Sequence, residues 1–255
     1  MSEGVTVYGL HAVEAVLERT PERVLGGLVQ RDRGDARLEA VRDACAAQGI
    51  NLRPVARAEL DRTAGGGRHQ GIILQCRPAE AWNEASLKDL VQAGGRDLLL
   101  LVLDGVTDPH NLGACLRSAD AAGVHAVVAP RDRAASLNPV ARKVASGAAE
   151  TVPFVQVTNL ARTLRWLQEQ GVWIVGAAGE GAETLWDVKF DGPIALAMGA
   201  EGAGLRRLTR EHCDQLVKIP MAGTVESLNV SVATGVCLFE IARQRARIAP
   251  GLSNQ

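Results

Sequence analysis

The sequence predicts an α/β protein in two parts, and three observations support this fold class. Short apolar runs alternate with segments of helical periodicity along most of the chain. The runs at 98–103, 194–198 and 216–219 are apolar at nearly every position, which is typical of strands buried on both faces of a parallel sheet. Residues 79–96 resemble a linker, because one short helical stretch lies there between Pro78 and the turn-forming Gly94-Gly95. We therefore expect a mostly parallel sheet covered by helices, preceded by a smaller α/β domain.

The first part, residues 1–78, shows the signals of a small layered domain. Short β-type runs and helical repeats alternate in it, which favours an α/β/α layer fold. Between the last two expected strands, the three glycines at 65–67 predict a mobile surface loop. Arg68 and His69 at its tip could contact phosphate, or the loop could be a connection without function. The expected elements are strands at 24–29, 50–55 and 71–75 and helices around 13–17 and 38–45.

The second part, residues 97–255, is predicted to consist of repeated strand and helix units. The expected strands are 98–103, 124–129, 152–157, 172–177, 194–198 and 216–219. The expected helices are 112–122, 160–170 and 229–245, with a further helix start at Asn138-Pro139. This alternation predicts that successive strands lie parallel, with the helices packed on the two faces of the sheet.

The composition is typical of a globular protein. Apolar residues make up 47% of the chain, enough for a sizeable core. No stretch approaches the roughly 20 continuous apolar residues that cross a bilayer, so we expect no membrane span. The first residues, Met1 to Gly4, have neither a basic start nor an apolar segment. We therefore expect no export signal and a cytoplasmic protein.

The cysteines, histidines and charges exclude some classes of site and leave others open. The five cysteines and five histidines form no C-x-x-C or H-x-x-x-H pattern. This predicts free buried thiols and no metal site. The formal net charge of −1 and the 3% of aromatic residues do not by themselves indicate a nucleic-acid-binding protein. Composition therefore leaves RNA binding undecided.

A polar loop follows the first buried strand of the second part, at the carboxyl end where open α/β sheets bind ligands. Within it, Asn111 is placed to cap the following helix. Arg117 lies four residues after Gly113, on the same helix face. We expect the Arg117 side chain to reach back over this glycine toward Asn111. Taken alone, a structural cap and a solvated arginine explain the pattern more simply.

Two further loops follow buried strands later in the chain. A glycine turn at 199–204 would let backbone groups approach a ligand closely. Its pattern is not G-x-G-x-x-G and it comes late in the domain, which disfavours a dinucleotide dehydrogenase. The loop at 219–229 leads into the last helix, where either Ser227 or Asn229 could be the N-cap. Their polar groups beside Ile219 and Leu228 also suit an adenosine pocket.

Together, in this order, the three segments closely resemble the three motifs of the SpoU/TrmH family of RNA ribose 2′-O-methyltransferases. The segments are DGVTDPHNLGACLRSADAAGV, MGAEGAGL and IPMAGTVESLNVSVATG. The resemblance covers nearly the whole chain and is fuller to the members that methylate a guanosine of 23S rRNA. The first part, with Tyr8 to His11 and the loop at 69–71, is less diagnostic. No family catalytic position is substituted.

The resemblance implies a fold, a cofactor and partners. The second part is expected to be a SPOUT-type α/β methyltransferase domain with a trefoil knot, and the first part an L30e-like domain that helps to hold RNA. Topology rules alone would argue against a knot. The implied cofactor is S-adenosyl-L-methionine, and the implied substrate is a guanosine in the peptidyl-transferase region of 23S rRNA. A homodimer is implied as well, in which Arg117 could serve the pocket of the other subunit.

The resemblance also implies the site residues. The expected catalytic set is Asn111, Arg117, Glu201, Ser227 and Asn229, and the expected cofactor-binding set is Gly199, Ile219 and Leu228. Because a guanidinium normally stays protonated, we interpret Arg117 as a clamp for RNA phosphate that also stabilises the developing alkoxide. Its action as a general base stays open. Glu201 is expected to order the glycine loop, and the two asparagines with Ser227 to hold Arg117 and the ribose in line.

Three other functions compete with this interpretation. A tRNA 2′-O-methyltransferase of the same family is the nearest. A non-catalytic RNA-binding module is the second, and the intact set of polar site residues argues against it. A nicotinamide oxidoreductase is the third, which a titration with NADH would exclude.

Overall fold

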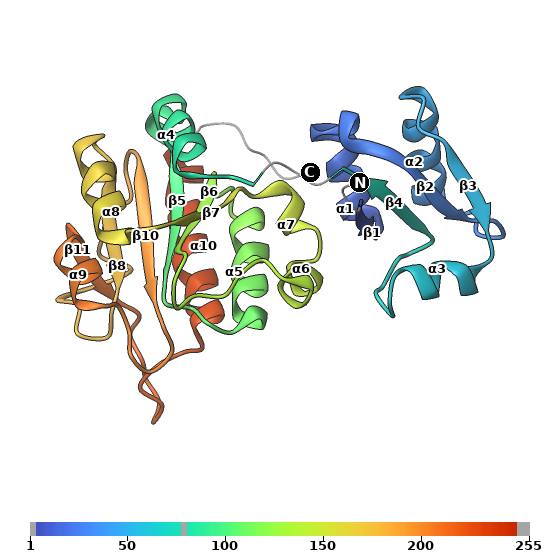
Figure 1. The fold of residues 1–255 in the computed structure, drawn as a ribbon. Helices are drawn as coiled ribbons and strands as arrows, with labels where there is room; N and C mark the ends of the chain where they lie inside the picture. The colour runs from blue at the N-terminus through green and yellow to red at the C-terminus, as the bar shows by residue number, and fades with distance from the viewer. Residues whose placement is uncertain (1–3, 78–80, 249–255) are drawn as a thin grey trace. The chain divides into compact units, whose positions relative to one another are not determined.

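The computed structural model describes residues 4–77 and 81–248, with side chains described as far as residue 246 (Figure 1). The chain divides into two compact units. The N-terminal unit comprises Met1–Glu80 with Ser146–Thr151, and the C-terminal unit comprises Ala81–Ala145 with Val152–Gln255. Residues 79 and 80 of the expected linker and the first three residues of the chain lie outside the described residues.

The N-terminal unit is built on a four-stranded sheet in the order β1-β4-β2-β3. Its elements are β1 (Val5–Tyr8), α1 (Leu10–Arg19), η1 (Pro21–Arg23), β2 (Val24–Gln30), α2 (Ala36–Ala47), β3 (Leu52–Val55), α3 (Arg57–Thr63), β4 (Ile72–Cys76) and α7 (Ala148–Thr151). Strand β4 runs antiparallel to β1 and β2, whereas β3 runs parallel to β2. Side chains alternate between the two faces of β4. Ile72 and Leu74 pack with α1 and α2, and Ile73 packs with Leu60 of α3, so the predicted α/β/α layers are confirmed.

Besides the short helices η1 and α7, strand β1 and helix α3 of this unit were not predicted from the sequence. Strand β1 has four residues, of which only Val7 is buried, so it shows little alternation. Helix α3 has seven residues and buries only Leu60. A single apolar position cannot establish a helical period. Both elements are therefore held by tertiary packing and not by a pattern visible in the sequence.

The glycine loop of the N-terminal unit is tied to its surroundings by hydrogen bonds. The glycines close the last turn of α3, where the Gly65 N–H donates to the carbonyl oxygen of Arg62 (3.2 Å). His69 is buried, and its Nε2 lies 2.9 Å from Oδ1 of Asp61. The prediction that His69 lies at a surface tip and can contact phosphate is therefore wrong. Arg68 is exposed and is still available for that role.

The C-terminal unit is built on a seven-stranded sheet in the order β7-β6-β5-β10-β8-β11-β9. Its strands are β5 (Leu99–Asp104), β6 (Ala126–Pro130), β7 (Phe154–Val157), β8 (Trp173–Ala177), β9 (Glu183–Thr184), β10 (Ile194–Gly199) and β11 (Gln215–Lys218). Its helices are α4 (Glu84–Ala93), η2 (Gly95–Asp97), α5 (Pro109–Ala121), α6 (Pro139–Ala145), α8 (Leu160–Glu169), α9 (Arg207–Glu211) and α10 (Val230–Ile248). Every pair of neighbouring strands is parallel, as predicted.

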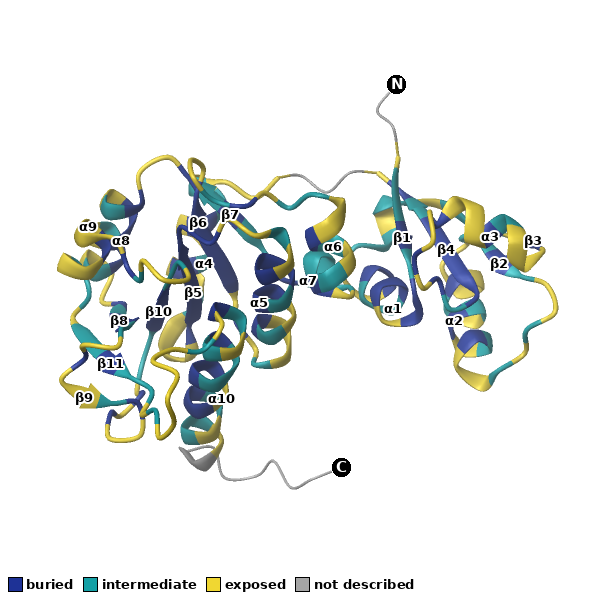
Figure 2. Cartoon of the chain, turned by 90° about the horizontal axis from the view of Figure 1, so that it is seen from below, coloured by how far each residue is buried: buried dark blue, intermediate teal, exposed yellow. Residues whose placement is uncertain are grey.

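Helices cover both faces of this sheet, and the central strands β5, β6 and β10 are buried almost throughout (Figure 2). Leu87 of α4 and Leu164 of α8 pack against Leu100 and Val102 of β5 on one face. Helices α5 and α10 pack against each other on the opposite face (Figure 1). A strand covered on both sides has no polar face, which explains the continuous apolar runs seen in the sequence.

The topology brings the three polar loops to one edge of the sheet. In a parallel sheet all carboxyl ends lie at the same edge. Strand β10 lies between β5 and β8, with Gly199 opposite Asp104 in the ladder. The loops after β5 and β10 therefore leave adjacent strands, although about 95 residues separate them in the chain. The loop after β11 leaves the same edge two strands away from β10.

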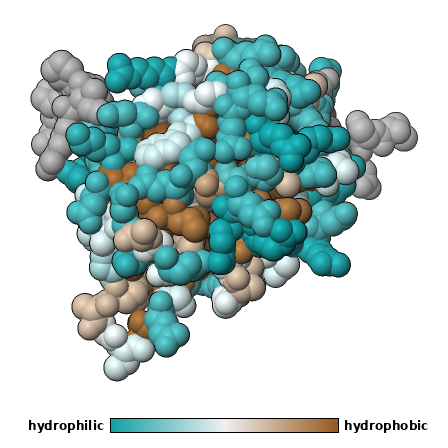
Figure 3. Space-filling view, turned by 90° about the vertical axis from the view of Figure 1, so that its left-hand side faces the viewer, coloured by the Kyte–Doolittle hydropathy of each residue, from teal (hydrophilic) through white to brown (hydrophobic). Residues whose placement is uncertain are grey.

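The face of the molecule seen in Figure 3 is mostly polar. On this face, hydrophilic side chains predominate and smaller hydrophobic areas lie between them. Among the described residues of the C-terminal unit, the large exposed apolar side chains are Trp82, Val140, Trp186, Leu208, Val225, Val232 and Phe239. Among the helices of the described residues, none is both long and apolar enough to cross a membrane.

Candidate active site

Asn229 connects the last helix with the polar loops. Its Oδ1 accepts hydrogen bonds from the backbone N–H of Ser231 (2.9 Å) and from the Ser231 hydroxyl (2.6 Å), so Asn229 is the N-cap of α10. Because Oδ1 is held by these donors, the other end of the amide must be Nδ2. Nδ2 donates to Oδ1 of Asn111 (3.0 Å) and to Oε1 of Glu201. One side chain therefore caps a helix and joins two loops.

Asn111, Glu201 and Asn229 form what we call the polar cluster. Asn111 comes from the start of α5, Glu201 from the loop after β10, and Asn229 from the loop after β11. Each of the three sequence motifs therefore supplies one member. The structure brings these three predicted residues together, although 118 positions separate Asn111 from Asn229 in the chain.

The prediction that Asn111 caps its helix is wrong. Helix α5 begins at Pro109, and its N-cap is Asp108, whose Oδ1 accepts from the backbone N–H of His110 (2.9 Å). This N–H also holds the pKa of the Asp108 carboxyl below its usual range. Asn111 lies inside the first turn and its side chain is free of capping, so the amide is available to Asn229. The Asp-Pro pair at 108–109 is the sequence signal that locates the cap.

The glycine loop after β10 folds tightly back on itself. Ala200 and Gly204 exchange two backbone hydrogen bonds, of 3.1 and 2.9 Å. A Cβ atom at Gly199 would overlap the backbone of Gly204 and Leu205, so only glycine fits at this position. Gly202 and Gly204 have φ angles of 74° and 65°, which favour glycine as well. Each of these glycines thus permits the turn that holds Glu201 at the polar cluster.

Asp104 is a buried carboxylate that sequence reasoning did not select. It is the last residue of β5, its side chain is fully buried, and its Oδ2 accepts from the backbone N–H of Arg206 (2.8 Å). Its Oδ1 lies 3.5 Å from Nε of Arg206 and has no hydrogen-bond partner among the described residues. The Arg206 guanidinium also donates to the carbonyl oxygen of Arg133 (3.2 Å). Asp104 thus ties the end of the glycine loop to the end of the neighbouring strand.

Replacement of Asp104 is expected to loosen this tie. Asp104→Ala leaves the partly buried Arg206 N–H without this acceptor, and we expect the free energy of unfolding to fall by about 1–3 kcal/mol. Asp104→Asn keeps an amide oxygen in the same place and should lose less. Urea unfolding followed by circular dichroism measures both. Equal losses in the two variants would show that the bond to the Arg206 N–H does not hold the loop.

Arg117 is separate from the polar cluster. It is exposed on α5, and among the described residues its guanidinium has no hydrogen bond or ion pair. The expected path over Gly113 is occupied, because a Cβ at Gly113 would lie 2.5 Å from the carbonyl oxygen of Ala141 and 2.7 Å from Cβ of Val144. Helix α6 fills that space. The absent side chain at Gly113 therefore serves helix packing, and the prediction that Arg117 reaches Asn111 across it is wrong.

The remaining predicted residues lie on the loop after β11. Ser227 is exposed and makes no hydrogen bond to the described part of the chain, so it is not the N-cap of α10. Ile219 and Leu228 are half-buried at the two ends of this loop. The loop thus offers apolar contact at both ends and a free hydroxyl next to Leu228. This arrangement suits a ligand with an apolar ring system and a few polar groups.

None of the cysteines near these loops is activated as a nucleophile. Cys115 is buried beside Thr234, and burial raises the pKa of its thiol to about 11. Burial likewise raises the pKa values of Cys213 and Cys237 to about 12. These groups stay protonated near neutral pH. All five thiols are free, as predicted, with four of them buried and Cys213 partly buried. The other polar groups of the three motifs include amides, carboxylates, the Ser227 hydroxyl, the Arg117 guanidinium and the exposed His110 imidazole, whose Nδ1 lies 3.1 Å from Oδ1 of Asp108.

Comparisons with known proteins fit this geometry. The model of the SpoU rRNA Methylase family matches residues 98–239, which include all three loops. The chain belongs to the SpoU rRNA methylase family. A second model, described as RNA 2′-O ribose methyltransferase substrate binding, matches residues 6–82, which fall almost wholly in the N-terminal unit.

Individual SpoU relatives cover nearly the whole chain. The 23S rRNA (guanosine-2′-O-)-methyltransferase RlmB of Yersinia pestis is 60% identical over 239 residues, 94% of this chain and 97% of the relative. RlmB of Escherichia coli K12 is 58% identical over 240 residues, 94% of this chain and 98% of the relative. At 94% coverage of this chain, each of these matches extends over both of its units.

Solved structures of SpoU proteins also match this chain, at lower sequence identity and with different coverage. The methyltransferase AviRb from Streptomyces viridochromogenes, in complex with the cofactor AdoMet, superposes with a TM-score of 0.74 at 25% identity. The match covers 96% of this chain and 92% of AviRb. The TrmH/SpoU tRNA modifying enzyme of A. aeolicus is 30% identical with a TM-score of 0.55, and it covers only 67% of this chain and 89% of its own.

Proposed function

We propose that this protein methylates the ribose 2′-hydroxyl of a guanosine in 23S rRNA, in its peptidyl-transferase region, with S-adenosyl-L-methionine as methyl donor. The observation that carries the proposal is the polar cluster. It joins the three motif loops of a SpoU family domain at the carboxyl edge of a parallel sheet. Ligands of open α/β sheets bind at this edge.

The residues of the two later loops fit S-adenosyl-L-methionine. Ile219 and Leu228 provide half-buried apolar contact for the adenine, and the turn that begins at Gly199 exposes backbone groups for its polar atoms. When bound, the cofactor supplies a methyl group on a sulfonium that needs no further activation. What the chain must add is orientation of the two reactants, which can contribute about 7–11 kcal/mol.

The chain's own residues divide this task. The polar cluster fixes the three loops relative to one another, with Glu201 holding the glycine loop and Asn229 holding the start of α10. Ser227 is positioned on the loop to accept or donate a hydrogen bond to the ribose. Arg117 clamps an RNA phosphate and stabilises the alkoxide that develops as the 2′-hydroxyl passes its proton to solvent water. A guanidinium without a hydrogen bond or ion pair to any described residue is suited to bind an anion.

Ribosomal RNA is favoured over tRNA as the substrate. The RlmB relatives match both units over 94% of the chain, whereas the tRNA modifying enzyme of A. aeolicus matches 67% of it. The match of residues 6–82 to a family model described as RNA 2′-O ribose methyltransferase substrate binding supports RNA recognition by the N-terminal unit. In this unit Arg68 is exposed beside the three glycines at 65–67, and its planar guanidinium suits a phosphate contact.

The remaining parts of the proposal concern assembly. We infer a cytoplasmic homodimer with a knotted C-terminal domain and no metal requirement. Val232 and Phe239 support the dimer, because they lie seven residues apart on one face of α10 and are 52% and 53% exposed. A second copy that covers this face would bury them. Such packing would also let Arg117 serve the pocket of the other subunit.

Transfer of a labelled methyl group tests the function. Purified protein is incubated with labelled S-adenosyl-L-methionine and with 23S rRNA from a bacterial strain that lacks its RlmB. We expect label in one guanosine, at the 2′-hydroxyl, which primer extension at low nucleotide concentration locates. Transfer to bulk tRNA and not to 23S rRNA would favour the tRNA enzyme. No transfer to either RNA would contradict the proposal.

A further inference from the structure

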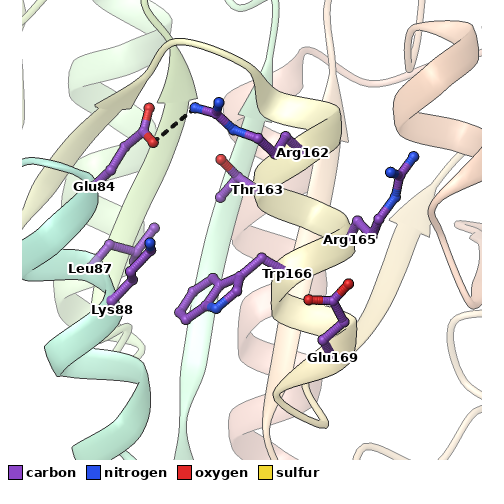
Figure 4. Close-up of a pocket in the computed structure, with 8 residues that line it drawn as sticks. All are labelled: Glu84, Leu87, Lys88, Arg162, Thr163, Arg165, Trp166 and Glu169. Carbon is purple, nitrogen blue, oxygen red and sulfur yellow. Dashed lines mark hydrogen bonds and ion pairs between the residues drawn. The ribbon is translucent and has the colours of Figure 1, made fainter.

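A cavity lies between α4 and α8, outside the three motif loops (Figure 4). Its volume is about 260 Å³, large enough for a nucleoside-sized group and smaller than a typical cofactor pocket. Its walls carry basic, acidic and aromatic side chains. They are Glu84, Leu87, Lys88, Arg162, Thr163, Arg165, Trp166 and Glu169.

An indole forms the wall of this cavity between the two helices. Trp166 projects from α8 toward α4, and Nζ of Lys88 lies 5.9 Å from the centre of its ring (Figure 4). Trp166 is half-buried and packs against the core of the sheet, which fixes the ring's position. In a chain with only 3% aromatic residues, an indole beside a cavity is notable. Nucleic-acid bases stack on such rings without regard to sequence.

The charges around the indole favour an anionic ligand. Glu84 is already occupied, because it accepts the backbone N–H of Thr158 (2.9 Å) and a bond from Arg162 (3.2 Å). These bonds hold the pKa of Glu84 below its usual range, so it remains a fixed partner of Arg162. Lys88 and Arg165 have no ion pair among the described residues. Of the acidic side chains, only Glu169 is left to oppose them.

The cavity begins at the same edge of the sheet as the motif loops. Thr158, which Glu84 contacts, follows the carboxyl end of β7. In the sheet β7 lies three strands from β10, and strands are spaced by about 4.8 Å, which puts the two ends roughly 14 Å apart. An RNA strand that reaches the glycine loop after β10 could therefore extend to the cavity within a few nucleotides.

We propose that this cavity binds one nucleotide of the RNA substrate, next to the methylated one along the strand or a few positions away. The base stacks on Trp166 and takes the place of the Lys88 ammonium over the ring. Lys88 and Arg165 then contact the phosphate of that nucleotide, and Arg162 is held at the rim by Glu84. The proposal rests on the proposed function only in taking RNA as the ligand.

Charge reversal of the exposed basic residues tests the proposal. The probe is a fluorescein-labelled transcript of the peptidyl-transferase region of 23S rRNA, titrated with the full-length protein and followed by anisotropy. We expect Lys88→Glu and Arg165→Glu each to weaken binding about tenfold. Trp166→Ala should do the same, and Trp166→Phe should restore most of the affinity. Affinity for S-adenosyl-L-methionine, measured by calorimetry, should stay within twofold of the wild-type value.

Arg96→Glu is the matched control. Arg96 is exposed and lines a second cavity on the same face, which has no aromatic residue. We expect Arg96→Glu to weaken RNA binding by less than threefold. An equal loss in Arg96→Glu, or unchanged RNA affinity in both Lys88→Glu and Arg165→Glu, would overturn the proposal. Unchanged RNA affinity in both variants would indicate that the cavity binds a protein partner instead.

Two further readouts separate the possible outcomes. Micromolar binding of free guanosine 5′-monophosphate without RNA would assign the cavity to a free nucleotide and overturn the RNA assignment. Methyl transfer by the wild-type protein is measured on the same transcript. If the wild-type protein binds RNA through this cavity but transfers no methyl group, the proposed function fails and the binding site stands.

Discussion

Arg117→Ala is expected to abolish most methyl transfer while the cofactor still binds. Removal of one donor that stabilises a developing oxyanion typically costs about 10²–10³ in rate, and we expect a loss of at least about 100-fold. The affinity for S-adenosyl-L-methionine should change by less than threefold, because Arg117 makes no hydrogen bond or ion pair to any described residue of the cofactor loops. Its side chain is exposed, so the thermal midpoint should stay the same.

The measurement combines calorimetry for cofactor binding with transfer of labelled methyl to 23S rRNA. Arg96→Ala is the control, since Arg96 is an exposed arginine at the opposite, amino edge of the sheet, just before β5. Arg117→Lys keeps the positive charge but not the planar fork, and it should recover only part of the rate. Near-normal transfer by Arg117→Ala would remove Arg117 from the mechanism.

Mixed dimers distinguish the two places where Arg117 can act. Subunits with Arg117→Ala are co-expressed with subunits in which Gly199→Ala disrupts the cofactor loop. If Arg117 serves the pocket of the other subunit, the mixed dimer contains one complete site and regains activity. If Arg117 serves its own pocket, neither site is complete and the mixed dimer stays inactive.

The sequence predicted the regular elements well where the core imposes a pattern. The buried strands β5 and β10 were located to within one residue, since a strand covered on both faces must be apolar throughout. Helix α9 and strand β9 were missed, because five and two residues are too few to show a period. The position of β10 between β5 and β8 depends on contacts between residues far apart in the chain. A local sequence pattern cannot predict such contacts.

The candidate site shows the same division. The polar character of Asn111, Glu201 and Asn229 was visible, but their hydrogen bonds depend on the convergence of three loops at one edge. Gly113 was interpreted from spacing as a path for Arg117, whereas the neighbouring helix α6 occupies it. Asp104 was overlooked because an acidic residue at the end of an apolar run resembles an exposed strand end. Its complete burial in the structure identifies Asp104 as the residue that ties the loop after β10 to β5.

Gly199→Ala is expected to eliminate cofactor binding while the fold persists. The φ angle of Gly199 is not among the positive ones, so alanine is compatible with the local conformation. The obstacle is space, since the new Cβ would overlap the backbone of Gly204 and Leu205. Backbone cannot rotate away as a flexible side chain can. The turn must therefore open, and the Ala200–Gly204 bonds must break with it.

We expect the affinity for S-adenosyl-L-methionine to fall at least about 100-fold, because in the proposed site the turn forms one wall of the pocket, and its displacement would misplace both backbone contacts and Glu201. The free energy of unfolding should fall by about 1–3 kcal/mol, the usual cost of overpacking. Gly179→Ala is the matched control. Gly179 follows the adjacent strand β8 at the same edge, and a Cβ there meets nothing within 4 Å.

Calorimetry and thermal unfolding of the two alanine variants provide the comparison. Gly179→Ala should bind S-adenosyl-L-methionine normally and unfold at the wild-type temperature or slightly above it, since alanine restricts the unfolded chain. A Gly199→Ala protein that binds the cofactor as tightly as Gly179→Ala would mean that the glycine turn does not contact S-adenosyl-L-methionine. The pocket would then have to lie elsewhere along the carboxyl edge of the sheet.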